Sequence, residues 1–176
     1  ATGALSLLDL PFNPLRNTPL GRISTAALDS FEHSTRAFGK PAFALPSTVI
    51  DGAEVAVHEE VVFRRPWCDL LHFRREASRP QDPVVLLVAP MSGHFATLLR
   101  GTVQAFLPDH DVYITDWRDA RDMPVIGPDF SLDDYVDDVT AFIAHLGPDC
   151  HVIAVCQPAV PVLAAVSLMN ADAPHT

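Results

Sequence analysis

Positively charged side chains are scarce in this sequence. Its 12 Lys and Arg residues stand against 22 Asp and Glu, so the formal net charge at pH 7 is −10. A phosphate backbone or an anionic bilayer would repel such a chain, which argues against nucleic acid or a charged membrane as a partner. Long apolar runs are also missing, since the longest covers residues 84–89 and a membrane-spanning helix needs about 20 residues. No basic start followed by an apolar core marks a secretion signal.

Cysteine is rare, with Cys68, Cys150 and Cys156 as the three examples. Cys150 and Cys156 flank an apolar run typical of a strand, and six extended residues would hold them about 20 Å apart. A disulfide tolerates a far smaller separation, so this pair cannot be bridged if the strand forms. The simplest interpretation is a free Cys156 in a reducing compartment, and we expect a cytoplasmic protein.

The first 47 residues are rich in Pro, Ser and Thr and show weak periodicity. We interpret residues 1–47 as an N-terminal extension, with one possible helix over residues 20–38. An Asp51-Gly52 pair then lies between two strand-like runs, residues 48–50 and 54–63, which is typical of a tight hairpin. Residues 67–73 are expected to form a further strand.

Apolar strands alternate with helices from residue 83 onward. The 176 residues, 48% hydrophobic and 19% charged, have the composition of a globular domain. The alternation favours an α/β fold with a mostly parallel sheet, helices on both of its faces and antiparallel strands at its N-terminal side. Ser131 is the expected N-cap of the second helix, whose neighbouring Asp residues (133, 134, 137 and 138) predict a solvated face. The predicted strands are residues 84–89, 112–115 and 152–155, and the predicted helices are residues 97–107, 132–146 and 158–169.

Cys156 falls where the third of these strands ends and the next helix begins. In α/β-hydrolases this corner is the nucleophile elbow, usually written G-x-S-x-G. Ala154 is small enough for the position two residues before the nucleophile, whereas Pro158 replaces the usual second Gly. A thiolate at a helix N-terminus is favoured by the helix dipole, which predicts that Cys156 is the nucleophile. The alternative is a buried structural cysteine at a strand end.

A turn-like segment, residues 90–94, follows the first strand and precedes a helix. In this architecture one oxyanion donor is the N–H of the residue after the nucleophile, here Gln157, and the other comes from the first strand-to-helix loop. Met91 is the first candidate for the second donor and Ser92 the next. An ordinary surface turn is the alternative for this segment.

Three stretches carry a resemblance to a known family. They are Leu-Val-Ala-Pro-Met-Ser-Gly-His at residues 87–94, Asp-His-Asp-Val-Tyr-Ile-Thr-Asp-Trp at residues 109–117, and His-Val-Ile-Ala-Val-Cys-Gln-Pro at residues 151–158. Together with residues 48–73 they resemble intracellular poly(3-hydroxyalkanoate) depolymerases. The resemblance implies a cysteine esterase that cleaves polyesters of 3-hydroxybutyrate-like units, without a cofactor, on or near polymer granules. It also implies a Cys-Asp-His triad, of which only the Cys position matches here.

The acid and the base of such a triad follow the nucleophile in sequence. Asp172 and His175 are the only such residues after Cys156, and a helix over residues 158–169 carries the chain roughly 18 Å from the elbow. We therefore expect the triad Asp and His to come from polypeptide outside this chain. The predicted partner is a C-terminal chain from the same precursor, which completes the hydrolase domain begun by residues 48–176.

Other residues have weaker assignments. His94 could form a dyad with Cys156 or order its own loop, and Ser92, His94, Asp116 and Trp117 are the candidates for substrate binding, since Asp116 and Trp117 follow the end of a strand. The remaining histidines show no metal-site spacing. Two other functions stay open: a polyhydroxyalkanoate synthase, whose elbow usually carries Gly on both sides of the Cys, and a non-catalytic granule-binding protein. The sequence also leaves open whether the chain forms a homo-oligomer.

Overall fold

The computed structural model describes residues 18–35, 39–77, 79, 81–91, 95–123 and 129–172. The chain divides into two compact units, residues 1–39 and residues 40–176. The described part of the first unit contains one helix, α2 (Pro19–Thr35), and residues 36–38 of the predicted helix lie outside the described residues. None of the described helices is long and apolar enough to cross a membrane.

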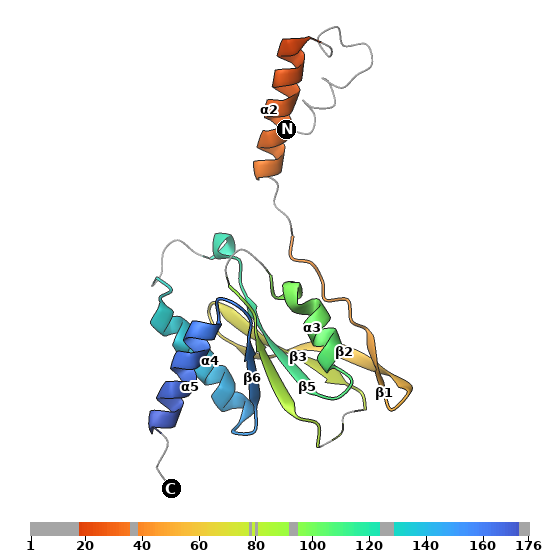
Figure 1. Cartoon of the computed structure of the whole chain (residues 1–176), viewed down its shortest axis with the longest axis vertical. Coiled ribbons are helices and arrows are strands. Elements are labelled where there is room, and N and C mark those ends of the chain that lie inside the picture. Colours follow the sequence, from red (N-terminus) through yellow and green to blue (C-terminus); the bar gives the residue numbers. More distant parts are fainter. Residues whose placement is uncertain are drawn as a thin grey trace. The chain divides into compact units, whose positions relative to one another are not determined.

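The second unit is a mixed α/β domain built on one six-stranded sheet (Figure 1). Across the sheet the strands follow the order β1-β2-β3-β5-β4-β6. The strands are β1 (Ser47–Ile50), β2 (Ala53–Arg64), β3 (Cys68–Arg75), β4 (Val84–Val88), β5 (Asp111–Trp117) and β6 (His151–Ala154). The helices are α3 (Arg100–Phe106), preceded by the 3-10 turn η1 (Ala96–Leu99), then η2 (Ala120–Asp122), α4 (Leu132–Leu146) and α5 (Ala159–Asp172).

The prediction of a mostly parallel sheet is wrong. Strand β4 lies parallel to β5 and to β6, but the pairs β1–β2, β2–β3 and β3–β5 are antiparallel. The reason lies in the connections. The loops after β1 and β2 are too short for a crossover helix, so these strands must form hairpins. Strand β3 also pairs antiparallel with β5, so antiparallel pairing extends beyond the N-terminal hairpin.

The predicted turn at Asp51-Gly52 is confirmed. Both residues have positive φ, 51° and 82°, which is the backbone geometry of a two-residue hairpin turn. The strand pairing runs directly into this turn, with Ile50 opposite Ala53. The second unit also begins earlier than residue 48, because Phe43 is buried edge-on against Phe73, with ring centroids 4.9 Å apart.

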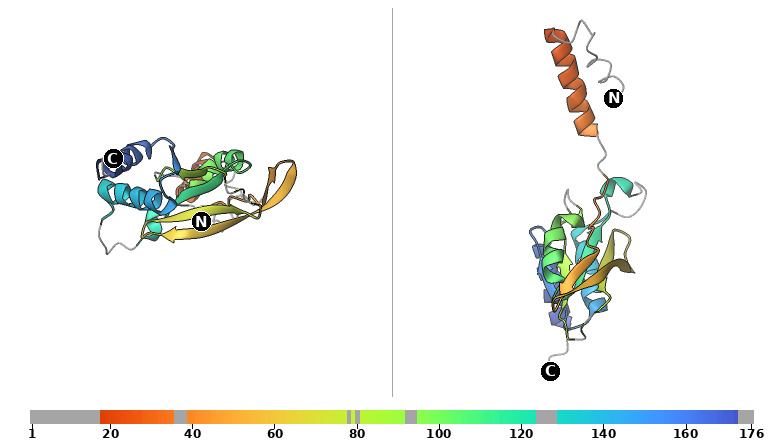
Figure 2. Two further views of the ribbon diagram at one scale, coloured as in Figure 1. Left: turned by 90° about the horizontal axis from the view of Figure 1, so that it is seen from below. Right: turned by 90° about the vertical axis from the view of Figure 1, so that its right-hand side faces the viewer.

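Helices cover both faces of the sheet, as predicted. Leu99, Val103 and Leu107 pack on one face together with Leu87 and Ile114. On the other face α4 and α5 pack over the alternate strand positions, among them Leu86 and Val88. Figures 1 and 2 show α4 and α5 side by side along one flank of the sheet, away from α3. This alternation follows from the period of two in a strand.

Helix α4 has the predicted bounds. Ser131 caps it through a reciprocal box: Ser131 Oγ accepts a hydrogen bond from the N–H of Asp134, and the Asp134 carboxylate accepts one from the N–H of Ser131. One of the predicted solvated carboxylates is instead buried, because Asp138 accepts a 2.7 Å hydrogen bond from Arg65 Nε. Burial raises the pKa of Asp138, and the bond from Arg65 opposes this shift.

Candidate active site

The sheet has a topological switch point at β4. The connection from β4 leads through α3 to β5 on one side, and the next connection leads through α4 to β6 on the other side. In open α/β sheets, ligands bind in the crevice outside the carboxyl ends of the strands at such a point. The loops that leave β4 and β6 at this crevice carry Met91 and Cys156, respectively.

Cys156 occupies a sharp corner between β6 and α5. Its φ is 69°, and the only other non-glycine residues with positive φ in the described part of the chain are Ala44 and Asp51. Residues other than Gly rarely adopt this conformation, and when they do so outside a simple turn the strain is often found at a functional position. Cys156 is exposed, whereas Cys68 is buried and Cys150 is partly buried. The corner therefore presents a free thiol to solvent.

The corner leads into α5 within three residues. The N–H of Ala159 donates a 3.2 Å hydrogen bond to the carbonyl of Cys156, and Pro158 is buried. Helix α5 begins at Ala159 and not at Pro158, and it extends to Asp172. Pro161 lies in the first turn of α5, where its missing N–H is not needed.

One hydrogen bond joins the two loops of the crevice. The N–H of Met91 donates to Oε1 of the Gln157 side chain over 2.9 Å. The strand register brings these loops together, because Val88 is the partner of Ala154 at the ends of β4 and β6. The N–H of Met91 therefore points at an amide oxygen, the same type of acceptor as a substrate carbonyl, next to Cys156.

The start of the loop after β4 is held by two side chains of β5. The N–H of Ala89 donates a 2.9 Å hydrogen bond to Thr115 Oγ1, and its carbonyl accepts a 2.9 Å bond from Trp117 Nε1. All three residues are buried. Both backbone groups of Ala89 are thus satisfied in an apolar setting, which fixes the direction in which Met91 leaves the strand.

Replacing Thr115 with Val is expected to lower the free energy of unfolding by ~1–3 kcal/mol. Val has the shape of Thr, but it leaves the buried N–H of Ala89 without its acceptor, and the desolvation cost of that group is then uncompensated. Urea denaturation at neutral pH measures the change. Thr115→Ser is the control, because it keeps the hydroxyl and should retain the protection of the Ala89 amide against hydrogen exchange. Equal loss of this protection in both variants would contradict the role of the hydroxyl.

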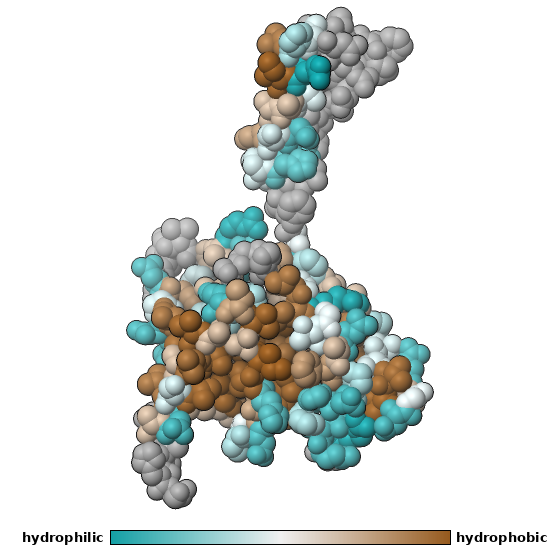
Figure 3. Space-filling model, in the orientation of Figure 1, coloured by the Kyte–Doolittle hydropathy of each residue, from teal (hydrophilic) through white to brown (hydrophobic). Residues whose placement is uncertain are grey.

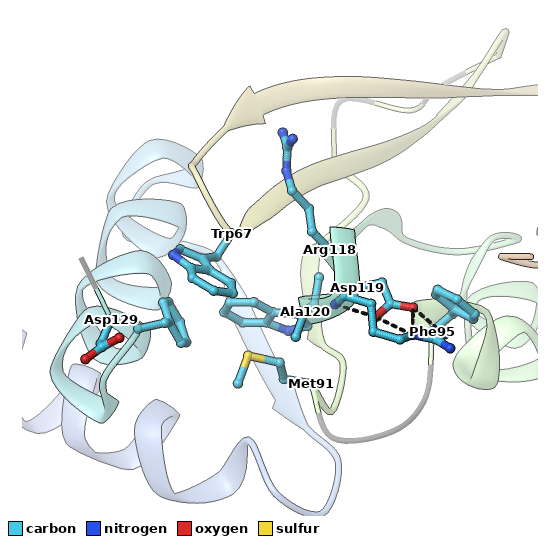
Figure 4. Close-up of a pocket in the computed structure, with 10 residues that line it drawn as sticks. Trp67, Met91, Phe95, Arg118, Asp119, Ala120 and Asp129 are labelled. Carbon is cyan, nitrogen blue, oxygen red and sulfur yellow. Dashed lines mark hydrogen bonds and ion pairs between the residues drawn. The ribbon is translucent and has the colours of Figure 1, made fainter. Parts of the chain in front are cut away.

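A cavity of about 770 Å³ opens beside Met91 (Figure 4). Trp117, at the end of β5, lines the cavity, whereas Asp116 forms an ion pair with Lys40. Sequence reasoning missed Trp67 and Phe130, which come from the β2–β3 loop and the segment before α4. No local pattern marks these two residues, because they approach Trp117 only in the folded domain. The cavity is lined by Trp67, Met91, Phe95, Trp117, Arg118, Asp119, Ala120, Arg121, Asp129 and Phe130.

The thiols other than Cys156 are poorly suited to react as nucleophiles. Burial raises the pKa of Cys68 well above its usual range, and burial also raises the pKa of Cys150. A raised pKa keeps a thiol protonated at neutral pH. Cys156 is therefore the candidate nucleophile among the three.

The described histidines of the second unit lie away from Cys156. His58 contacts the Glu76 carboxylate, and His72 stacks on Tyr113 and contacts Asp111. His110 precedes β5 and His151 opens β6, so both lie at the amino ends of their strands. His145 is in the last turn of α4. Ser92, His94 and His175, and with them the predicted dyad of Cys156 and His94, lie outside the described residues.

Within residues 18–172, in the parts that the structure describes, no group of three or more His, Cys, Asp and Glu side chains is placed to hold a metal ion. The arrangement that remains is the exposed thiol of Cys156, the N–H of Met91 that donates to the side chain of the next residue, Gln157, and a cavity with an aromatic wall beside Met91. Comparison with known proteins finds no match: no family model, no curated protein and no solved structure matches this chain.

Proposed function

We propose that the second unit is part of an α/β-hydrolase and that it cleaves esters of hydroxyalkanoate polymers through Cys156. The observation that carries the proposal is the exposed Cys156 with positive φ, at a strand-to-helix corner of the switch point. The two parallel crossovers around β4 and the position of the elbow directly after β6 support the fold assignment. The polymer substrate rests on the sequence resemblance to intracellular depolymerases.

The chemistry runs in two steps. The thiol of Cys156 gives its proton to the base, the thiolate attacks the ester carbonyl carbon and a C–S bond forms, and the C–O bond to the alcohol breaks as the alcohol oxygen takes that proton from the base. Water then attacks the thioester, the C–S bond breaks, and the acid and the thiol are released. The N–H groups of Met91 and Gln157 stabilise the oxyanion in both steps, after the substrate oxygen has replaced Gln157 Oε1 as acceptor for Met91.

Two other functions are alternatives to the hydrolase. A polymer synthase would transfer the acyl group to a growing chain and not to water. The Ala154 and Pro158 that flank Cys156 argue against it, since synthases usually carry Gly at both positions. A non-catalytic granule-binding protein would not need a strained, exposed thiol, so the geometry of Cys156 favours the hydrolase.

An exposed apolar face on α5 supports the proposal of a partner chain. On α5 the side chains of Val160 and Leu163 are 65% and 69% exposed, and those of Val166 and Leu168 are 44% and 56% exposed. Strand β6 pairs with β4 and is the last strand of the described sheet. Figure 3 shows apolar surface gathered over this region. A second polypeptide that adds a strand beside β6 would cover these residues and could bring the Asp and the His to Cys156.

Denaturing mass spectrometry tests the proposal. After brief incubation with an activated 3-hydroxybutyryl ester and an acid quench, the chain that contains Cys156 should carry one hydroxybutyryl group, and peptide mapping should place the group on Cys156. The same spectrum of active protein should contain a second polypeptide. Acylation of Cys150 instead, or no acylation at all, would contradict the nucleophile. Activity from a lone species of this chain would contradict the partner and favour His94 as the base.

A further inference from the structure

The cavity beside Met91 has an aromatic wall assembled from three parts of the chain. The ring of Trp67 lies 5.1 Å from that of Phe130, and the ring of Trp117 lies 5.9 Å from that of Phe130. Trp117 is fixed from behind, because its Nε1–H donates to the carbonyl of Ala89 and its ring packs against Tyr135 at 4.3 Å. Trp67 is held through its carbonyl, which accepts a hydrogen bond from the N–H of Arg118. The wall is therefore preorganised (Figure 4).

Met91 joins this cavity to the candidate active site. Its side chain lines the cavity, while its N–H points to Gln157 in the loop after β6. A linear ligand whose carbonyl accepts a hydrogen bond from Met91 N–H can therefore continue along the Met91 side chain into the aromatic cavity.

The charged groups of the cavity cancel one another. The lining contains two positively charged and two negatively charged side chains, so their formal charges sum to zero. They are Arg118, Arg121, Asp119 and Asp129. Arg121 donates to both carboxylate oxygens of Asp119, and Arg118 Nη2 donates to Asp69 Oδ1 over 3.2 Å. In Figure 4 the guanidinium of Arg118 points away from Trp67 and Met91. A lining with no net charge selects against ligands that carry a strong charge of either sign.

We propose that this cavity binds several consecutive units of an uncharged aliphatic ester chain, so that the protein selects oligomers over esters of a single unit. The inference rests on the proposed function and adds to it the side of the site that holds the chain. The volume of the cavity, about 770 Å³, is in the range of pockets that bury drug-sized ligands. A single four-carbon hydroxyacyl unit would leave most of this volume empty. The aromatic wall packs against the aliphatic stretches, and the N–H of Met91 donates a hydrogen bond to one carbonyl of the chain.

Intrinsic fluorescence reports on this cavity directly, because the chain contains two tryptophans and both line it. Cys156→Ala protein, with any partner chain in place, is titrated with a methyl-ester-capped trimer of 3-hydroxybutyrate and with the methyl ester of the monomer. We expect a saturable change of the emission with the trimer, and an affinity at least ~10-fold higher than for the monomer. Equal affinities, or no saturable change, would overturn the proposal. The trimer with a free carboxylate should bind more weakly than the capped trimer, and tighter binding of the acid would overturn the neutral-ligand assignment.

Two pairs of variants in the Cys156→Ala background locate the binding. Trp67→Ala should weaken trimer binding by ~10-fold or more, with Trp117 as the remaining reporter, whereas Trp67→Phe keeps a ring and should bind nearly normally. Ala120→Phe should block the cavity by added bulk without removing any packed side chain, and Ala120→Ser is its matched control. Unchanged trimer binding in Ala120→Phe would overturn the site. Binding is measured in Cys156→Ala protein, so it does not depend on hydrolysis. If this variant binds the trimer but protein that retains Cys156 hydrolyses no ester, the proposed hydrolase function is refuted and the cavity assignment stands.

Discussion

Cys156→Ala protein is expected to lose ester cleavage by a factor of ~1,000 or more, while its fold is retained. Removal of the nucleophile from a covalent mechanism leaves only binding and oxyanion stabilisation, which together account for a small part of the rate. Steady-state hydrolysis of a 3-hydroxybutyrate oligomer measures the loss, and circular dichroism checks the fold. Cys156 is exposed, so the change to Ala creates no cavity in the core.

Two further variants test whether the loss of activity is specific to the thiol of Cys156. Cys156→Ser should retain little activity, because a hydroxyl needs stronger base assistance than a thiol. Cys150→Ala is the matched control, since Cys150 lies six positions earlier at the other end of β6 and burial raises the pKa of its thiol. Activity should survive this change. Normal turnover by Cys156→Ala, or equal losses in the two alanine variants, would remove Cys156 from the mechanism.

Arg75→Met is expected to lower the free energy of unfolding by about 3 kcal/mol. The Arg75 side chain is fully buried, and it donates to Asp82 Oδ2 over 2.7 Å and to the carbonyl of Leu107 over 3.0 Å. Removing one partner of a buried ion pair leaves the other charge poorly compensated, which costs far more than the loss of a surface pair. Urea denaturation at pH 7 measures the difference.

Arg74→Met is the control for this prediction. Arg74 is the neighbour of Arg75 in β3, but its side chain is half-exposed and pairs with the exposed Glu60, so we expect little change in stability. Equal destabilisation by the two substitutions would contradict the buried role of Arg75.

The same ion pair gives the stability a dependence on pH. Burial raises the pKa of Asp82, but the hydrogen bonds and charges of Arg75 and Arg79 together outweigh this effect, and the net shift is downward. A lowered pKa in the folded state stabilises the protein above the unfolded value, about 4, and this contribution is lost as the pH falls through the folded value. The stability of Arg75→Met should therefore decline less than that of the natural sequence between neutral pH and acid.

Local signals in the sequence were sufficient for most of the single elements. The bounds of α4 follow from the apolar period of its residues and from the cap at Ser131, and the hairpin follows from Asp51-Gly52, where both residues must have positive φ. Cys156 could be selected because a strand pattern ends and a helix pattern begins around it. Each of these features depends on residues within about one helical turn or one tight turn of each other, so neighbouring residues determine them.

The direction of pairing, the buried charges and the cavity depend on residues far apart in the chain. An apolar strand pattern predicts that a strand is buried, but it does not predict the direction of its neighbours. The antiparallel pairing of β3 with β5 could not be predicted in this way, and it makes antiparallel pairs the majority in the sheet. The same holds for Arg75 and Asp138, which sequence alone would leave in solvent and which the fold buries with partners. The aromatic wall of the cavity forms only after the β2–β3 loop and the segment before α4 meet at the end of β5, which brings together Trp67, Phe130 and Trp117. The sequence by itself thus determined the elements and the candidate nucleophile, while packing between distant segments decided what surrounds it, because those contacts have no local pattern.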